Sequence, residues 1–199
     1  FFYKLHITLV NFKLRHICVF SIKKLMKSKE NIVFLGMMGS GKTTIGKLVS
    51  KKLNLNFFDT DEEIENRLNM KISKIFNEKG EIFFRKFEER LTLELLKKKR
   101  IVISLGGGTF LNNKIRKEIL NNHLSFWLKW DDKTLLKRIK NSYKRPIAFH
   151  SNHDELLKLM KKRSNIYSKA LYIVDCEELN KNELVNKIIK IYENNKIKS

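Results

Sequence analysis

The stretch that decides the fold is NIVFLGMMGSGKTTIGKLVSKKL, which runs from Asn31 to Leu53. Its opening run is apolar from Ile32 to Leu35, with two β-branched residues, and predicts a buried strand over 31–35. Apolar residues recur at helical spacing from Ile45 onward. Between the two, GMMGSGKT (36–43) matches the pattern G-x-x-x-x-G-K-S/T at every position. Strand, loop and helix in this order predict a site for the phosphates of a nucleoside triphosphate.

Each residue type in this loop has a physical role. Glycines let backbone N–H groups turn inward around phosphate oxygens, and the following helix adds the positive end of its dipole. Lys42 is expected to reach the β and γ phosphates, and the hydroxyl of Thr43 to bind Mg²⁺. The predicted phosphate-binding residues are Gly39, Ser40, Gly41, Lys42, Thr43 and Thr44.

The rest of the chain alternates short apolar runs with longer helical stretches. The runs that predict strands are 31–35, 56–59, 101–105, 124–130 and 171–175. Apolar strands that alternate with helices predict an α/β fold, with a parallel sheet covered by helices on both faces. Because no repeat or low-complexity linker interrupts residues 30–199, we expect a single domain there.

Residues 1–29 differ from the rest, with seven Lys or Arg and no Asp or Glu. Lys13 and Arg15 interrupt their apolar stretch, whereas a membrane span needs about 18 to 20 uninterrupted apolar residues. One interpretation is a basic targeting segment for import into an organelle. The favoured interpretation is that translation begins at Met26, so that residues 1–25 are not part of the working protein. Residues 1–29 as a whole are expected to form a disordered or non-native extension, and the protein to be cytoplasmic.

Composition leaves the partner open. A formal net charge of +21 over 199 residues is compatible with nucleic acid, an anionic membrane surface, or a small phosphorylated or carboxylated ligand. The lysines are scattered, however, and do not cluster with aromatic residues, which argues against a nucleic-acid interface. Cys18 and Cys176 lie far apart without metal-ligand spacing, so we expect two free thiols in a reducing compartment.

Candidate acceptor residues follow the second and third predicted strands. In DTD (Asp59 to Asp61), a period of two places both carboxylates on one side of the chain, at the edge where parallel sheets bind ligands. Asp59 would hold the metal through water and Asp61 would orient or deprotonate a hydroxyl. Alternatively, Asp61 only caps the following helix. GGG (Gly106 to Gly108) predicts close approach to a ligand, or merely a tight turn.

Arginine is rare in this chain, with 9 residues against 33 lysines. An arginine therefore suggests a position that needs the planar guanidinium group, which can donate two parallel hydrogen bonds. In GEIFFRKFEER, Arg85 lies four residues after Glu81 and three before Glu88, which allows a surface ion pair. The residues expected on the buried side of this helix are Phe83, Phe87 and Leu91. Arg85 would then lie off the centre of that side, beside a cleft, where it suits a planar carboxylate.

Residues 141–153 (NSYKRPIAFHSNH) lack clear periodicity and include the only proline, Pro146. A loop of this length predicts a lid that closes over the site. The alternative is a passive surface excursion.

Together these motifs resemble those of the shikimate kinases, a nucleoside-monophosphate-kinase-like family of P-loop proteins. GMMGSGKTT, FFDTD, IFNEKGEIFFRKFEE, SLGGG, KRPI and KRSNIY occur in the family's order and at about its spacing, between Asn31 and Tyr192. The resemblance implies a three-layer fold with a lid loop and a five-stranded parallel sheet in the order 2-3-1-4-5. It also implies transfer of a phosphoryl group from ATP, with Mg²⁺, to the 3-hydroxyl of shikimate. The enzyme would be a monomer that needs neither nucleic acid nor membrane.

The same resemblance implies roles for the acceptor residues. Arg85 and Arg163 would clamp the shikimate carboxylate, Glu88 would orient Arg85, and Gly106 to Gly108 would line the pocket. Asp61 would hold ring hydroxyls and receive the proton as the 3-hydroxyl attacks.

For the nucleotide, the resemblance implies that Lys42, Asp61 and Arg145 are the catalytic residues, with Arg145 moving from the lid onto the phosphates. Arg138 would lie near the adenine, and Thr43 with a water-linked Asp59 would hold Mg²⁺. The chain departs from the family pattern at Ala148, where leucine is usual, and at Asn165, where proline is usual. Neither position carries a charge.

Two other functions stay open on the residues alone. A related kinase acting on gluconate or a nucleoside monophosphate would share the phosphate loop, and gluconate also carries a carboxylate. A basic nucleic-acid-binding module would use the nucleotide only as a switch. DTD, Arg85 with Glu88, and GGG in combination favour shikimate.

Overall fold

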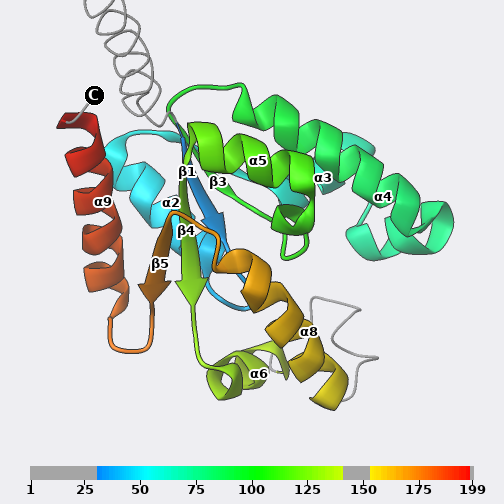
Figure 1. Cartoon of the computed structure of the whole chain (residues 1–199). Helices are drawn as coiled ribbons and strands as arrows, with labels where there is room; N and C mark the ends of the chain where they lie inside the picture. The colour runs from blue at the N-terminus through cyan, green and yellow to red at the C-terminus, as the bar shows by residue number, and fades with distance from the viewer. Residues whose placement is uncertain (1–30, 141–152, 198–199) are drawn as a thin grey trace, which may run out of the picture.

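The computed structural model describes residues 31–140 and 153–197, and at their centre lies a five-stranded sheet (Figure 1). The strands are β1 (Ile32–Leu35), β2 (Asn56–Asp59), β3 (Ile101–Ser104), β4 (Leu124–Lys129) and β5 (Tyr172–Asp175). All neighbours pair in parallel, in the order β2-β3-β1-β4-β5. Every predicted strand begins and ends within one residue of its predicted bounds, and the predicted order is confirmed.

Helices cover both faces of the sheet, which gives three layers. They are α2 (Lys42–Leu53), α3 (Thr60–Leu68), α4 (Ile72–Leu96), α5 (Asn113–Asn122), α6 (Asp132–Lys140), α8 (His153–Tyr167), α9 (Lys181–Ile197) and the short 3-10 helix η1 (Thr109–Leu111). Side chains of β1 alternate between the faces. Ile32 and Phe34 pack in one core with α2 and α9, whereas Val33 and Leu35 pack in the other with α4, α5 and α8. Because both faces are covered, β1 and β3 are buried at every position.

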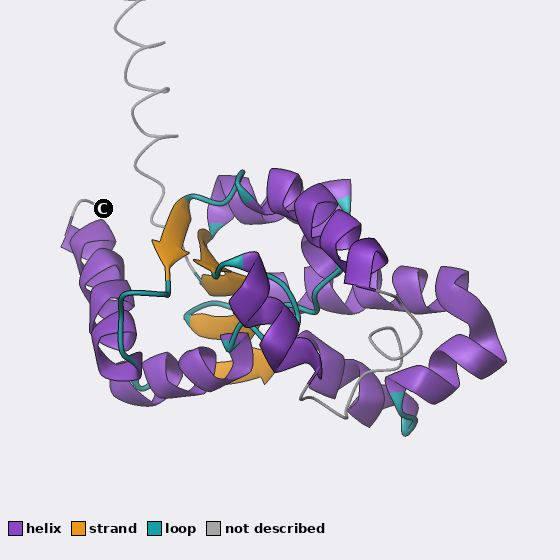
Figure 2. Cartoon of the chain, turned by 90° about the horizontal axis from the view of Figure 1, so that it is seen from below, coloured by secondary structure: helices purple, strands orange, loops and turns teal. Residues whose placement is uncertain are grey.

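The candidate residues follow the carboxyl ends of four neighbouring strands. Since the strands are parallel, the loops after β1, β2, β3 and β4 leave from the same edge of the sheet. In Figure 1 the arrowheads of β4 and β5 point to this edge, where α6 and α8 lie. Figure 2 looks onto it from below, with helices on both sides of the strands.

Helix α4 corrects one prediction from the sequence. Its buried side chains include Phe84 and Glu88, whereas Phe83 is 37% exposed and Phe87 is only half-buried. Of the predicted stripe, Leu91 alone is fully buried. The prediction failed because Glu88 holds a core position through polar contacts, and a search for apolar periodicity does not detect a buried carboxylate.

Two predicted features lie outside the described residues. They are the basic segment 1–29 and the stretch of the lid that contains Arg145, Pro146 and Ala148. Within 31–140 and 153–197, no helix is both long enough and apolar enough to cross a membrane.

Candidate functional site

The loop between β1 and α2 has the backbone of a phosphate cradle. Gly36, Gly39 and Gly41 have φ angles of 141°, 77° and 87°, which residues with a Cβ rarely adopt. Gly41 is the N-cap of α2, so the positive end of the helix dipole lies at the loop. Within the described chain, the N–H groups of Gly39 and Gly41 form no hydrogen bond, which leaves them available to phosphate oxygens.

Lys42 closes this loop from the first turn of α2. Its Nζ donates to the carbonyl oxygens of Gly36 and Met37, at 3.0 and 2.8 Å, and its side chain is buried. The ammonium group is therefore already positioned over the loop and does not extend into solvent.

Thr43 and Asp59 meet at the start of the second loop. Thr43 Oγ1 donates to Asp59 Oδ2 at 2.6 Å, and Asp59 Oδ1 accepts from the backbone N–H of Asp61 and Glu62 at 3.0 and 3.4 Å. Asp59 is thus the N-cap of α3, which corrects the alternative that Asp61 caps this helix. The period-of-two argument for DTD is also wrong, because β2 ends at Asp59 and Asp61 already lies in the first turn of α3.

The three glycines after β3 form a turn against which polar side chains pack. A Cβ on Gly106 would collide with Asp61 Oδ1, and one on Gly108 would lie 2.7 Å from Arg85 Nη1. On Gly107 it would lie 3.3 Å from Arg163 Nη1. The turn, 106–108, therefore brings together Asp61, Arg85 and Arg163 from α3, α4 and α8, and the absence of side chains on it leaves room for all three.

This acceptor turn (106–108) keeps two backbone donors available. Gly106 N donates to Thr60 Oγ1 at 2.8 Å, and Thr109 N donates to Gly106 O at 3.1 Å. The N–H groups of Gly107 and Gly108 form no hydrogen bond with any described residue. Gly107 lies against Arg163 and Gly108 against Arg85, so both N–H groups are near a guanidinium group and available to a bound oxygen.

Arg85 is held by two carboxylates. Its Nη1 donates to Glu88 Oε2 at 2.8 Å and its Nε to Glu81 Oε1 at 3.2 Å. Arg85 therefore makes the ion pair with Glu81 that its spacing allowed, and at the same time a second one with Glu88. Burial opposes the charge of Arg85, but Glu88 and Glu81 outweigh it and raise the pKa of the guanidinium above its ordinary value. Glu88 is buried, and its Oε1 accepts from Thr109 Oγ1 at 2.7 Å. Arg85 is therefore oriented by two carboxylates of α4, one of which is held by Thr109 at the start of η1.

Arg163 has a different environment. The residue is 7% exposed, its Nη1 lies 3.9 Å from the sulfur of Met37, and its Nε is buried without a hydrogen bond. It makes no ion pair with any residue in 31–140 or 153–197. Burying a guanidinium without a carboxylate partner costs free energy. Binding of an anion that is not part of the described chain would offset this cost.

The comparisons with known proteins agree with this geometry. The sequence model of the shikimate kinase family matches residues 38–193. The chain belongs to the shikimate kinase family. Shikimate kinase from Thermodesulfovibrio yellowstonii is 41% identical over 165 residues, which cover 82% of this chain and 95% of that protein. The Bacillus subtilis shikimate kinase is 40% identical over 168 residues, covering 81% and 88%.

Solved structures of shikimate kinases share the fold. The enzyme from Bacteroides thetaiotaomicron is 30% identical with a TM-score of 0.76, over 82% of this chain and 98% of that one. The enzyme from Acinetobacter baumannii, solved in complex with shikimate, is 29% identical with a TM-score of 0.78, over 87% and 98%. A gluconokinase from Sinorhizobium meliloti reaches a TM-score of 0.54 at 15% identity, which shows a likeness of fold alone.

On the nucleotide side of this shikimate kinase family member, Arg138 lies beside the phosphate loop. Its guanidinium carbon is 3.6 Å from the centroid of the Trp130 ring, and its Cβ would be 3.5 Å from a Cβ on Gly39. Trp130 Nε1 in turn donates to Ser40 O at 2.9 Å. Trp130 therefore fixes both the loop and the arginine that was predicted near the adenine.

The sequence reasoning missed four residues of this site. They are Thr60, Thr109, Trp130 and Tyr167. Two of them could have been found from their position in the sequence, because Thr109 follows the three glycines directly and Tyr167 lies one helical turn after Arg163. No sequence pattern indicates that Thr60 Oγ1 would accept from Gly106 N, since that contact joins the start of α3 to the turn after β3.

Proposed function

We propose that this protein transfers the γ-phosphoryl group of ATP to the 3-hydroxyl of shikimate. The observation that carries the proposal is the buried guanidinium of Arg163, which has no ion pair among the described residues and faces the same glycine turn as Arg85. A planar carboxylate bound between two guanidinium groups would satisfy both through charge-assisted hydrogen bonds. Membership of the shikimate kinase family supports shikimate over gluconate or a nucleoside monophosphate.

The charges at the acceptor turn match a single carboxylate. Inside the protein, the buried carboxylate of Glu88 balances Arg85, whose second partner, Glu81, is exposed to solvent. Arg163 contributes a buried positive charge that has no ion pair among the described residues. A ligand with one negative charge would complete the balance with little net charge left buried. The N–H groups of Gly107 and Gly108 add donors for its oxygens.

For the reaction itself, we propose that the residues act mainly by positioning and by charge. Asp61 lies against Gly106 at the first turn of α3, where its carboxylate orients the attacking hydroxyl and accepts its proton. Lys42, held over the phosphate loop, stabilises the charge on the transferred group. The catalytic role of Arg145 stays a prediction from the family resemblance.

We further propose that Mg²⁺ accompanies ATP. Thr43 Oγ1 and Asp59 Oδ2 are hard oxygen donors 2.6 Å apart beside Lys42, a set that suits Mg²⁺ held by Thr43 and, through water, by Asp59. Among the described residues, no group of three or more His, Cys, Asp or Glu converges. A sparse protein donor set is the usual one for Mg²⁺ that binds together with nucleotide phosphates, whose charge it neutralises.

The test is an assay of the full chain with ATP and Mg²⁺, in which ADP release is followed while shikimate, gluconate and AMP are offered in turn. We expect release that depends on shikimate and stops when EDTA removes the metal. Phosphorus NMR of the product should show a phosphate ester at the 3-oxygen of shikimate. Release no faster with shikimate than without an acceptor would disprove the proposal.

The prediction of a monomer can be checked on the same sample by light scattering coupled to size-exclusion chromatography. The cytoplasmic location stays a prediction from the sequence.

A further inference from the structure

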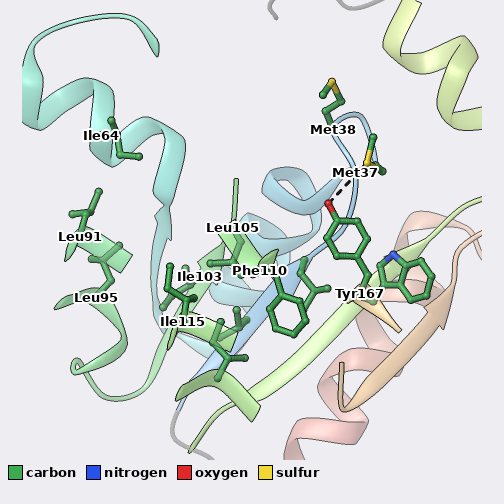
Figure 3. Packing of buried hydrophobic residues seen from close by; sticks show 14 of the residues in the cluster. Met37, Met38, Ile64, Leu91, Leu95, Ile103, Leu105, Phe110, Ile115 and Tyr167 are labelled. Carbon is green, nitrogen blue, oxygen red and sulfur yellow. Dashed lines mark hydrogen bonds between the residues drawn. The ribbon is translucent and has the colours of Figure 1, made fainter. Parts of the chain in front are cut away.

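We infer that Tyr167, at the end of α8, is a positioning residue for the acceptor turn; this inference rests on the proposed function. The Tyr167 hydroxyl donates a hydrogen bond to the carbonyl oxygen of Gly107. It also lies 3.9 Å from the sulfur of Met37, a contact that Figure 3 marks with a dashed line. The residue is 1% exposed. Tyr167 therefore connects α8 with both the acceptor turn and the phosphate loop.

The hydroxyl has one proton to donate, and the carbonyl of Gly107 is a stronger acceptor than a thioether. The proton is therefore directed to Gly107, with the polarizable sulfur of Met37 beside it. The same sulfur is approached by Arg163 Nη1 at 3.9 Å. Arg163 and Tyr167, one helical turn apart, are thus packed against one atom of the phosphate loop.

The hydrogen bond to Gly107 sets the direction of one particular peptide group. In a planar trans peptide the C=O and the following N–H point in opposite directions, so the N–H of Gly108 points away from Tyr167. That N–H is one of the two donors of the acceptor turn that have no partner among the described residues. Tyr167 therefore determines where a donor of the acceptor turn is aimed.

Neighbouring carbonyls of the turn have backbone partners. Gly106 O accepts from Thr109 N and Gly108 O from Leu111 N, at 3.1 and 3.0 Å. The carbonyl of Gly107 is held instead by a side chain from a distant helix. Since glycine has a wide choice of backbone angles, this peptide would rotate more freely without the hydroxyl.

Packing fixes the ring that carries this hydroxyl. The Tyr167 ring lies 5.9 Å from the Trp127 ring, centroid to centroid, within the buried cluster of Figure 3. Tyr167→Phe should keep this packing and remove only the hydroxyl. The matched control is Tyr172→Phe, since the Tyr172 hydroxyl accepts from Asn195 Nδ2 at 3.0 Å, between β5 and α9 and away from the turn.

The experiment measures shikimate binding to the full chain by calorimetry, and KM and kcat for both substrates. For Tyr167→Phe we expect the Kd and KM for shikimate to rise about 5- to 10-fold, while kcat and the KM for ATP stay within about 2-fold. Tyr172→Phe should leave all four values unchanged.

A folded Tyr167→Phe protein that binds shikimate as the wild type does would overturn the inference. So would equal increases in both KM values, which indicate a general distortion. If circular dichroism shows that Tyr167→Phe does not fold, Met37→Leu replaces it. That variant removes the sulfur shared by Tyr167 and Arg163, so the KM for shikimate should rise about 2- to 3-fold, and an unchanged KM overturns the inference. Failure of the proposed function is a separate result, namely a wild-type protein without shikimate-dependent ADP release.

Discussion

The phosphate loop and the acceptor turn lie on neighbouring strands, yet they are built in different ways. The phosphate loop comes from one continuous stretch, 36–43, to which β2 adds Asp59. The acceptor turn gains its function from α3, α4 and α8, whose side chains are separated by up to about a hundred residues in sequence. Backbone geometry defines the first site, and tertiary packing defines the second.

The two regions also hold their positive charges differently. Lys42 is satisfied by carbonyl oxygens of its own loop, at 2.8 and 3.0 Å. At the acceptor turn, Arg85 is paired with Glu88, but Arg163 is buried without a carboxylate among the described residues. The ammonium group of Lys42 is therefore hydrogen-bonded within its own loop. The buried charge of Arg163 has no carboxylate partner among the described residues and needs a ligand to balance it. Substitutions in the two regions should differ in their effects on stability and on each substrate.

The largest effect is expected at the phosphate loop. Lys42→Met should lower kcat about 100- to 1000-fold, because the charge that stabilises the transferred group is lost, while shikimate binding measured by calorimetry stays near the wild-type value. Lys47→Met is the matched control, since Lys47 lies on the same helix and pairs with Glu62 at the surface. A Lys42→Met enzyme with more than about a tenth of the wild-type kcat would contradict this role.

The next effect should separate binding from stability at the acceptor turn. Arg163→Met should raise the KM for shikimate about 100-fold, because the carboxylate of the bound substrate would lose its buried guanidinium partner. The melting temperature of the ligand-free protein should not fall, because the variant removes a buried charge that has no ion pair among residues 31–140 and 153–197. Calorimetric melting checks this, with Arg67→Met, at the exposed pair with Glu94, as a control for loss of an arginine. A marked decrease in melting temperature would mean that another group of the protein already balances the charge of Arg163 before shikimate binds.

A smaller effect is expected when Glu88, which orients Arg85, loses its hydrogen bond from Thr109. In Thr109→Val, Glu88 Oε1 loses its donor while it stays buried, which should cost about 1–3 kcal/mol of unfolding free energy. The KM for shikimate should rise about 5-fold as Arg85 loses part of its orientation. Thr109→Ser keeps the hydroxyl and should resemble the wild type in both denaturation and kinetics. Equal behaviour of the two variants would show that the hydroxyl is unimportant.

The smallest effect concerns the link between α3 and α4. Hydrogen bonds from Arg67 hold the pKa of Glu94 below its ordinary value of 4.5. The stabilisation is therefore fully present above pH 4.5 and is lost as the pH falls through the lower folded-state pKa. Urea unfolding of the wild type and of Glu94→Gln should converge in this acidic range, whereas kcat at neutral pH is unchanged. The control is Glu178→Gln, which alters an exposed carboxylate without an ion pair in the described chain. A difference between wild type and Glu94→Gln that is constant with pH would rule out this linkage.

Much of the fold was predictable because its signals are local. Five apolar runs and the glycine pattern of the phosphate loop reflect strand burial and positive φ angles, which depend on adjacent residues. The buried side of α4 was mispredicted, since Glu88 is a core residue only through Arg85 and Thr109. The link from Tyr167 to Gly107 could not be predicted either, because it joins residues 60 positions apart.

By itself, the sequence determined the α/β class, the strands, the phosphate loop and which polar residues were available, since these follow from periodicity and residue type over short distances. Only the tertiary structure decided which of those residues face the acceptor turn and which hydrogen-bond or ion-pair partner each one has. It paired Arg85 with Glu88, left Arg163 without a carboxylate among the described residues, and aimed the Tyr167 hydroxyl at Gly107. Hydrogen bonds and buried charges depend on distances of a few ångströms between distant segments, and these distances exist only once the sheet and its helices are packed.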